Sequence, residues 1–157
     1  MKIYFLRHGV AVEPEDWKGH DYDRPLTADG RERMASEAKA IRKLDLKLDA
    51  ILTSPLVRAK ETADIVAGAL KIVSKEDDRL GGDFDISSLE EILKDHVGLK
   101  ALMLVGHEPS MSATIGRLIG VARIDLKKGA LACVELADAL TTTGELLSVV
   151  PPKVLLL

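Results

Sequence analysis

The sequence has little of two residue types on which whole classes of protein depend. Among its 157 residues there is one cysteine, and aromatic side chains make up 3% of the chain. A single cysteine, Cys133, cannot form an internal disulfide or a zinc-ligand spacing, which favours a reducing compartment. So few aromatics argue against the stacking platforms that bind single-stranded nucleic acid or sugars. The core must therefore be aliphatic.

An excess of positive charge and long apolar runs are also missing. Lysine and arginine number 22 against 25 aspartates and glutamates, for a net charge of −3. This balance argues against a nucleic-acid coat or a basic membrane patch. The apolar start of the chain is interrupted at Arg7, and no stretch approaches the about 18 apolar residues of a membrane span. We expect a soluble, cytoplasmic protein with neither nucleic acid nor a membrane as its partner; no pattern specifies an oligomeric state.

The composition is that of an ordinary globular domain, with 46% hydrophobic and 30% charged residues. A chain of this length buries about 70% of the surface that its unfolded form exposes, so it needs no disulfide or structural metal. We therefore expect one domain that spans residues 1–157.

Short apolar runs that end abruptly in polar residues predict buried strands at 3–6, 50–53 and 101–105. Helices are expected at about 28–44, at about 55–69 and from 109 to about 120. Thr27 is the predicted N-cap of the first helix, and Ser54 with Pro55 the N-cap and first turn of the second.

Weaker signals complete the chain. They predict a brief strand at 72–73, a short helix after Ser87, and two antiparallel strands at 130–136 and 145–150. Helices that alternate with buried strands indicate an α/β fold. We expect a three-layer domain with a largely parallel central sheet of about five or six strands and helices on both faces.

Polar residues with phosphate-binding chemistry follow the three buried strands. Arg7 and His8 follow the first, Arg58 lies in the helix after the second, and His107 follows the third. Ligands of open α/β sheets bind beyond the carboxyl ends of the strands, where these residues meet. The planar guanidinium group of arginine can donate two parallel hydrogen bonds to phosphate oxygens. The helix N-termini predicted before residues 55 and 109 add backbone N–H donors. The sequence therefore predicts a phosphate pocket.

Two histidines suit phosphoryl transfer because imidazole serves near pH 7 as a neutral nucleophile or as a cationic donor. No histidine or aspartate cluster with metal-ligand spacing accompanies them, and two guanidinium groups would repel a divalent cation. We therefore expect neither a metal nor another cofactor.

Three segments, in order along the chain, carry a resemblance to a known family. They are Arg7-His8-Gly9, the run from Ser54 through Arg58 to Ala63, and Gly106-His107-Glu108-Pro109. Together they resemble the histidine phosphatase, or phosphoglycerate mutase-like, superfamily. The short chain and the segment 24–30, with sequence RPLTADG, are similar to the small phosphohistidine phosphatases of the SixA type.

The resemblance implies a role for each pocket residue. His8 would attack phosphorus and become phosphorylated, Arg7 and Arg58 would hold the phosphoryl oxygens, and His107 would donate to them as a cation. The implied substrate is phosphohistidine in a protein, the alternatives being a small phosphorylated molecule or a non-catalytic phosphate-binding module. Arg24 is either a further phosphate contact or a member of a surface ion pair.

The chain departs from the larger members of this superfamily, which carry a glutamate as general acid in the stretch corresponding to 78–85. That stretch has no glutamate here, which leaves Asp21, Asp78, Asp83 and Asp85 as candidates. The imidazole of phosphohistidine leaves readily, so a strong acid is less necessary than for an ester. The chain also lacks the length for a large cap. We expect its apolar end, 154–157, to dock on the body of the domain.

Overall fold

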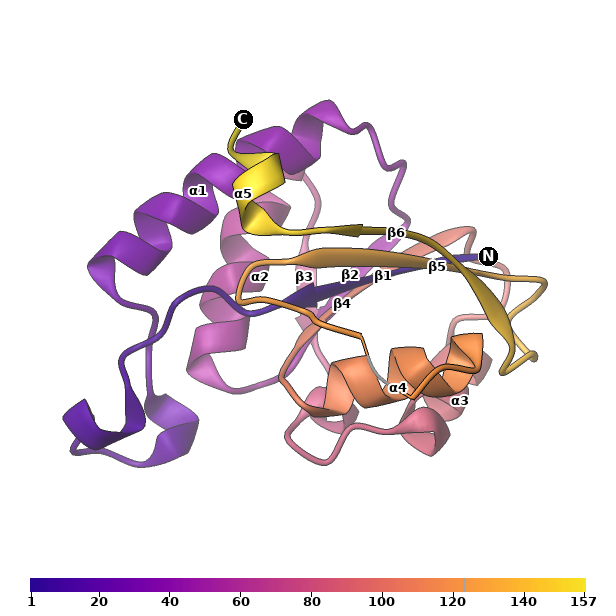
Figure 1. Cartoon of the computed structure of the whole chain (residues 1–157), viewed down its shortest axis with the longest axis horizontal. Coiled ribbons are helices and arrows are strands. Elements are labelled where there is room, and N and C mark those ends of the chain that lie inside the picture. Colours follow the sequence, from indigo (N-terminus) through magenta and orange to yellow (C-terminus); the bar gives the residue numbers. More distant parts are fainter. Residues whose placement is uncertain (123) are drawn as a thin grey trace.

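The computed structural model describes residues 1–122 and 124–157, and in this part of the chain a six-stranded sheet lies between two layers of helices (Figure 1). The strands are β1 (Lys2–Arg7), β2 (Ala50–Thr53), β3 (Ser74–Glu76), β4 (Ala101–Gly106), β5 (Leu131–Leu136) and β6 (Gly144–Val150). The helices are α1 (Ala28–Lys43), α2 (Val57–Leu70), α3 (Ile86–Asp95), α4 (Ser110–Ile119) and α5 (Pro152–Leu155), with short 3-10 turns η1 (Pro14–Asp16), η2 (Asp21–Asp23) and η3 (Asp78–Leu80).

The strands are ordered β3-β2-β4-β1-β5-β6 across the sheet. Neighbours from β3 to β1 run parallel, whereas β5 is antiparallel to both β1 and β6. Parallel neighbours need crossover connections, and helices supply them. The predicted three-layer fold with a largely parallel sheet is confirmed.

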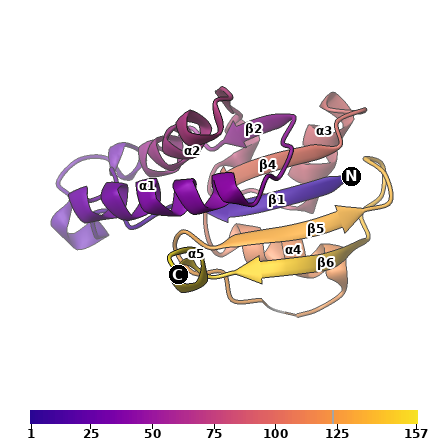
Figure 2. The same ribbon diagram turned by 90° about the horizontal axis from the view of Figure 1, so that it is seen from above.

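The helices α1, α2 and α5 cover one face of the sheet, and α3 and α4 cover the other (Figures 1 and 2). Successive side chains of a strand point to opposite faces. In β4, Leu102 and Leu104 therefore join the core beneath α3 and α4, while Met103 and Val105 join the core beneath α1 and α2. Leu155 of α5 is buried in the second core, whereas Val154, Leu156 and Leu157 are exposed, so the predicted docking of 154–157 holds only for Leu155.

Two local predictions were wrong. The helix α2 begins at Val57 rather than 55, with Leu56 at its N-cap. The predicted strand at 72–73 is instead irregular chain just after α2, which ends at Leu70. Lys71 adopts a left-handed φ of 60°, and Ile72 N donates to Ala67 O at 3.1 Å, which satisfies an end carbonyl of the helix. The strand β3 begins two residues later, at Ser74.

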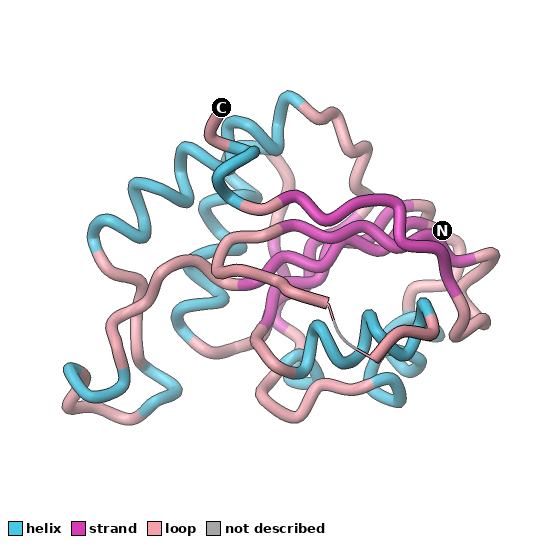
Figure 3. Tube along the Cα trace, viewed as in Figure 1, coloured by secondary structure: helices cyan, strands magenta, loops and turns pink. Residues whose placement is uncertain are grey.

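The long segment between β1 and α1 projects from the carboxyl ends of the parallel strands and contains η1 and η2 (Figure 3). Trp17 Nε1 donates to His20 O at 2.9 Å, so its indole packs within this loop. Thr27 caps α1 as predicted, since its Oγ1 accepts from Gly30 N at 2.9 Å. No helix in the described residues combines the length and the apolar character that a membrane crossing requires.

Candidate active site

Neighbouring strands bring the two predicted histidines together. His8 follows β1 and His107 follows β4, and His8 N donates to Gly106 O at 3.1 Å. Their ring centroids lie 5.3 Å apart, with the rings tilted by 52°. This proximity follows from the pairing of β1 with β4 in parallel register, which places Arg7 opposite Gly106.

His8 is buried and held in one orientation. Its Nδ1 lies 2.8 Å from Gly9 O. A carbonyl oxygen only accepts, so Nδ1 carries the proton and Nε2 keeps its lone pair. Burial, with help from nearby His107 and Arg58, lowers the pKa of His8 to about 3. The imidazole is therefore neutral at neutral pH, as a nucleophile must be.

Thr62 ties the chain after His8 to α2. Gly9 N donates to Thr62 Oγ1 at 3.0 Å, and that hydroxyl donates to Arg58 O at 2.8 Å. Thr62 was not predicted as a site residue. It lies four residues after Arg58, and this spacing, which places both side chains on one face of the helix, could have indicated that Thr62 lies near the pocket.

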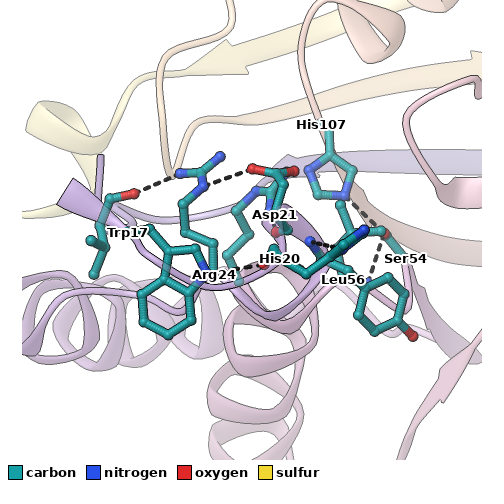
Figure 4. Close-up of polar contacts among 10 residues, drawn as sticks. Trp17, His20, Asp21, Arg24, Ser54, Leu56 and His107 are labelled. Carbon is teal, nitrogen blue, oxygen red and sulfur yellow. Dashed lines mark hydrogen bonds and ion pairs between the residues drawn. The ribbon is translucent and has the colours of Figure 1, made fainter. Parts of the chain in front are cut away.

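Arg58 is buried and bonds Asp21 of the long loop. Its Nη1 donates to Asp21 O at 2.9 Å, and its Nη2 donates to Asp21 Oδ2 at 3.2 Å. Arg24 Nε donates to Asp21 Oδ1 at 2.9 Å (Figure 4). The carboxylate therefore lies between two guanidinium groups. The bond from Arg24, together with Arg58, holds the pKa of Asp21 below its ordinary value. Arg24 thus forms an ion pair with Asp21, which is one of the two roles predicted for it.

The pocket has more donors than acceptors. Arg7 Nη1 donates to Leu126 O at 2.9 Å. Within the described residues, however, the Nε atoms of Arg7 and Arg58 are buried and find no hydrogen-bond partner. Buried donors are costly to leave unpaired, and such donors are normally matched by acceptors. A site rich in guanidinium donors suits a phosphoryl anion.

His107 is buried, and its Nε2 lies 2.8 Å from Ser54 Oγ. Burial and the charge of Arg58 lower the pKa of His107 to about 4, which the carboxylate of Asp21 partly counteracts. The ring is therefore neutral at pH 7 in the protein without substrate, whereas the predicted cation concerns the state with a bound phosphoryl group. Ser54 was predicted only as a helix cap, so its contact with His107 was missed.

The model of the histidine phosphatase superfamily (branch 1) matches residues 3–84, which is more than half of the chain. The chain belongs to the histidine phosphatase superfamily. The matched part contains Arg7, His8 and Arg58. His107 lies beyond it, and the structure brings this residue to His8.

Solved structures of histidine phosphatases share the fold. The protein histidine phosphatase SixA complexed with tungstate superposes with a TM-score of 0.87, 22% identity and 98% of both chains covered. An alpha-ribazole phosphatase from Shigella flexneri gives a TM-score of 0.72 and 19% identity, with 97% of both chains covered. At these identities the likeness shows the phosphoglycerate mutase-like fold alone.

Two curated relatives align with the chain. A phosphohistidine phosphatase SixA homolog of Haemophilus influenzae is 28% identical over 132 residues, or 76% of this chain and 78% of that protein. An uncharacterized protein of Picosynechococcus sp. is 46% identical over 69 residues. That match covers 44% of this chain and 41% of the relative, so the chain matches less than half the length of that relative.

The four candidate general acids lie in different surroundings. Asp85 Oδ1 accepts from Ser88 N at 2.9 Å and so caps α3. Asp21 bonds Arg58 directly. In the contacts of the described residues, neither Asp78 nor Asp83 bonds a pocket arginine through its side chain. Asp21 is therefore the candidate that reaches the pocket.

A cavity of about 1070 Å³ lies at the other end of the sheet, lined among others by Lys2 and Ala101 at the amino ends of β1 and β4. The histidines follow the carboxyl ends of the same strands, so this cavity is separate from the histidine phosphatase site. Among the described residues, no group of three or more histidine, cysteine or acidic side chains is placed to hold a metal ion.

Proposed function

We propose that this protein is a phosphohistidine phosphatase that hydrolyses phosphohistidine in another protein, without a metal, through a phosphohistidine intermediate on His8. The observation that carries the proposal is the bond from His8 Nδ1 to Gly9 O at 2.8 Å. It leaves Nε2 unprotonated on a buried, neutral ring. The nucleophile is therefore prepared without a separate base to remove its proton.

In the first step, His8 Nε2 forms a bond to phosphorus while the P–N bond of the substrate breaks. The step starts from the substrate ring in its protonated form, with a proton on its other nitrogen, so this ring leaves as neutral imidazole. Arg7, Arg58 and His107 supply hydrogen bonds to the phosphoryl oxygens as charge redistributes. The guanidinium charges thus provide the positive field that a metal supplies in other phosphatases.

In the second step, water attacks the phosphorus and the Nε2–P bond breaks. His8 is regenerated, and both protons of the water leave with inorganic phosphate as H₂PO₄⁻. Neither step requires a carboxylic acid to protonate a leaving group. An ester substrate differs, because its alkoxide leaving group does need a proton.

The ionised state of Asp21 supports a phosphohistidine substrate over an ester. Its position between Arg24 and Arg58 lowers its pKa, so it holds no proton to donate at neutral pH. The SixA homolog of Haemophilus influenzae, aligned over 76% of this chain, agrees with the same substrate class. A small phosphorylated molecule is the second candidate, favoured by the fold shared with an alpha-ribazole phosphatase.

The test is a substrate panel assayed with and without a chelator. It contains a peptide phosphorylated on histidine, p-nitrophenyl phosphate, and common sugar and nucleotide monophosphates. We expect the phosphohistidine peptide to be turned over fastest, at a rate that the chelator does not change. Comparable rates on a monophosphate would support the second candidate, and loss of activity on chelation would refute the metal-free mechanism. Tight peptide binding without turnover would indicate a binding module.

A further inference from the structure

Ser54 is completely buried and contacts His107 through its side chain. Its relative exposure is 0%, and its Oγ lies 2.8 Å from His107 Nε2. Figure 4 shows this contact as a dashed line between the imidazole of His107 and Ser54. Because α2 begins only at Val57, the hydroxyl is not consumed in capping that helix.

The hydrogen count of the serine hydroxyl determines the direction of this bond. A hydroxyl has one hydrogen and two lone pairs. One lone pair accepts from Leu56 N at 3.2 Å, and His107 Nε2 is the other polar partner of Oγ among the described residues. If a neutral His107 carried its proton on Nε2, the hydrogen of Ser54 would have no acceptor. In that case both the serine hydrogen and the lone pair of His107 Nδ1 would be buried without a partner, whereas a proton on Nδ1 leaves only the Nδ1–H unpaired. Unpaired buried polar groups are costly, so Ser54 O–H donates to Nε2.

The proton of the neutral ring must then lie on the other nitrogen. His107 Nδ1 is buried and has no hydrogen-bond partner among the described residues. We propose that Ser54 is a positioning residue that holds neutral His107 as the Nδ1–H tautomer, so that the ring donates to the phosphoryl group without becoming a cation. This inference rests on the proposed function, in which His107 contacts the phosphoryl oxygens.

The surroundings of His107 explain why a neutral donor is favoured. The titratable and charged groups around the ring are Arg58, Asp21, Arg24, Arg7 and His8. Three of them are guanidinium groups, which oppose a further positive charge in a buried site. A tautomer fixed by Ser54 provides an N–H donor and adds no charge to this cluster.

The direct test is ¹⁵N NMR of the histidine rings in the substrate-free protein at pH 7, with His107 assigned by the loss of its signals in His107→Gln. We expect His107 to show a protonated Nδ1 and an unprotonated Nε2. His20 provides an internal reference with the opposite tautomer, because its Nδ1 accepts from Tyr22 N at 3.2 Å. A protonated Nε2 on His107 would overturn the proposal. That result is independent of turnover, so it would leave the proposed function standing.

The second test compares kcat/KM for p-nitrophenyl phosphate between pH 4 and pH 8 in the wild type, Ser54→Ala and Ser54→Thr. Without the hydroxyl, neutral His107 divides between two tautomers. We expect a loss of about tenfold at pH 8 in Ser54→Ala, the lower end of what removing a partner that orients a histidine costs. The deficit should shrink toward pH 4, near the pKa of His107, where the growing cationic fraction carries a proton on both nitrogens. Ser54→Thr should recover most of the activity.

Thr53→Val is the matched control, because it also removes a buried hydroxyl at the end of β2, one that donates to Ser54 O rather than to a histidine. It should keep the pH profile of the wild type. An equal deficit in Ser54→Ala at every pH, with no recovery in Ser54→Thr, would mean a merely structural role and would overturn the proposal. A wild-type protein inactive on every phosphorylated substrate would refute the proposed function instead, while the NMR experiment would still decide the tautomer.

Discussion

Asp21 bonds Arg58 twice, through its backbone carbonyl at 2.9 Å and its carboxylate at 3.2 Å. The carboxylate occupies a guanidinium donor that a phosphoryl oxygen would use, so an incoming anion must compete with it. The carbonyl bond does not depend on the side chain. The loop and the arginine can therefore stay together when the carboxylate is replaced.

Replacing Asp21 with asparagine should tighten the binding of tungstate or phosphate. The variant removes a negative charge next to the pocket while keeping the size of the side chain. Because the Asp21 side chain is well exposed, we expect the binding free energy to become more favourable by about 0.5–1 kcal/mol. Isothermal titration calorimetry should then show a Kd that is roughly two- to fivefold lower. Weaker binding in Asp21→Asn would show instead that the carboxylate is needed to orient Arg58.

Turnover of phosphohistidine should change little in the same variant. An imidazole leaving group takes no proton from an acid, and the carboxylate of Asp21 is already ionised. We expect the rate on a phosphohistidine peptide to stay close to that of the wild type in both Asp21→Asn and the control Asp83→Asn. A rate that collapses in either variant would refute the idea that P–N cleavage explains the missing glutamate.

Arg58→Ala should weaken both binding and turnover, because the guanidinium group is buried in the pocket. Loss of one preorganised donor costs about 2–4 kcal/mol of transition-state stabilisation. Arg58→Lys should restore only part of this, since an ammonium group cannot reproduce the two-pronged fork. The comparison is made from kcat/KM of the three proteins. A lysine variant equal to the wild type would exclude bidentate clamping by Arg58.

His8→Ala should abolish turnover while leaving oxyanion binding only weakened, because Arg7, Arg58 and His107 still supply donors. The assay combines tungstate titration with capture of the phosphoprotein by a denaturing quench at alkaline pH. In the wild type, base-stable and acid-labile phosphate should appear on His8. Activity in His8→Ala above a few per cent of the wild-type rate would exclude His8 as the nucleophile.

The meeting of Arg7, His8 and His107 was predictable because short apolar runs mark buried strands, and parallel strands end at one edge of a sheet. The partner of Arg58 was not predictable in the same way. Asp21 lies 37 residues away, in a loop without hydrophobic periodicity. The sequence could only name it among four candidate acids, whereas the fold brings its carboxylate to the pocket.

Ser54 shows a second limit of sequence analysis. A serine before a proline has the pattern of a helix N-cap, and the same pattern fits a serine whose hydroxyl bonds a histidine 53 residues away. Likewise, the apolar pair at 72–73 was mistaken for a strand, because nothing local shows that Lys71 turns the backbone. The polar edge strand β3 lacks the apolar alternation by which strands are recognised.

Two helical glycines should respond oppositely to alanine. A Cβ at Gly30 of α1 would overlap the carbonyl oxygen of Val10, whereas a Cβ at Gly68 of α2 would meet nothing within 4 Å. Gly30→Ala should destabilise the protein by about 1–3 kcal/mol through overpacking. Gly68→Ala should stabilise it by about 0.5–1 kcal/mol, because alanine is the better helix former. Urea unfolding measures both, and a stabilised Gly30→Ala would contradict the close approach.

Stability should fall as the pH is lowered from 7 to 5, because both pocket histidines are buried as neutral rings. Burial lowers the pKa of His8 to about 3 and that of His107 to about 4, from 6.5 in the unfolded chain. Between these values the unfolded chain binds more protons than the folded protein. The stabilisation is therefore complete above pH 6.5 and decreases below it, by up to about 1.4 kcal/mol per pH unit for each histidine.

Urea unfolding at pH 7, 6 and 5 measures this slope. His107→Gln removes one of the two buried rings and should reduce the slope to about half of the wild-type value. His20→Gln is the control, because His20 is exposed and its loss should leave the slope unchanged. Activity should persist to pH 5, since His8 stays unprotonated well below that pH. An unfolding free energy that is constant from pH 7 to pH 5 would show that the two rings are not held neutral by the fold.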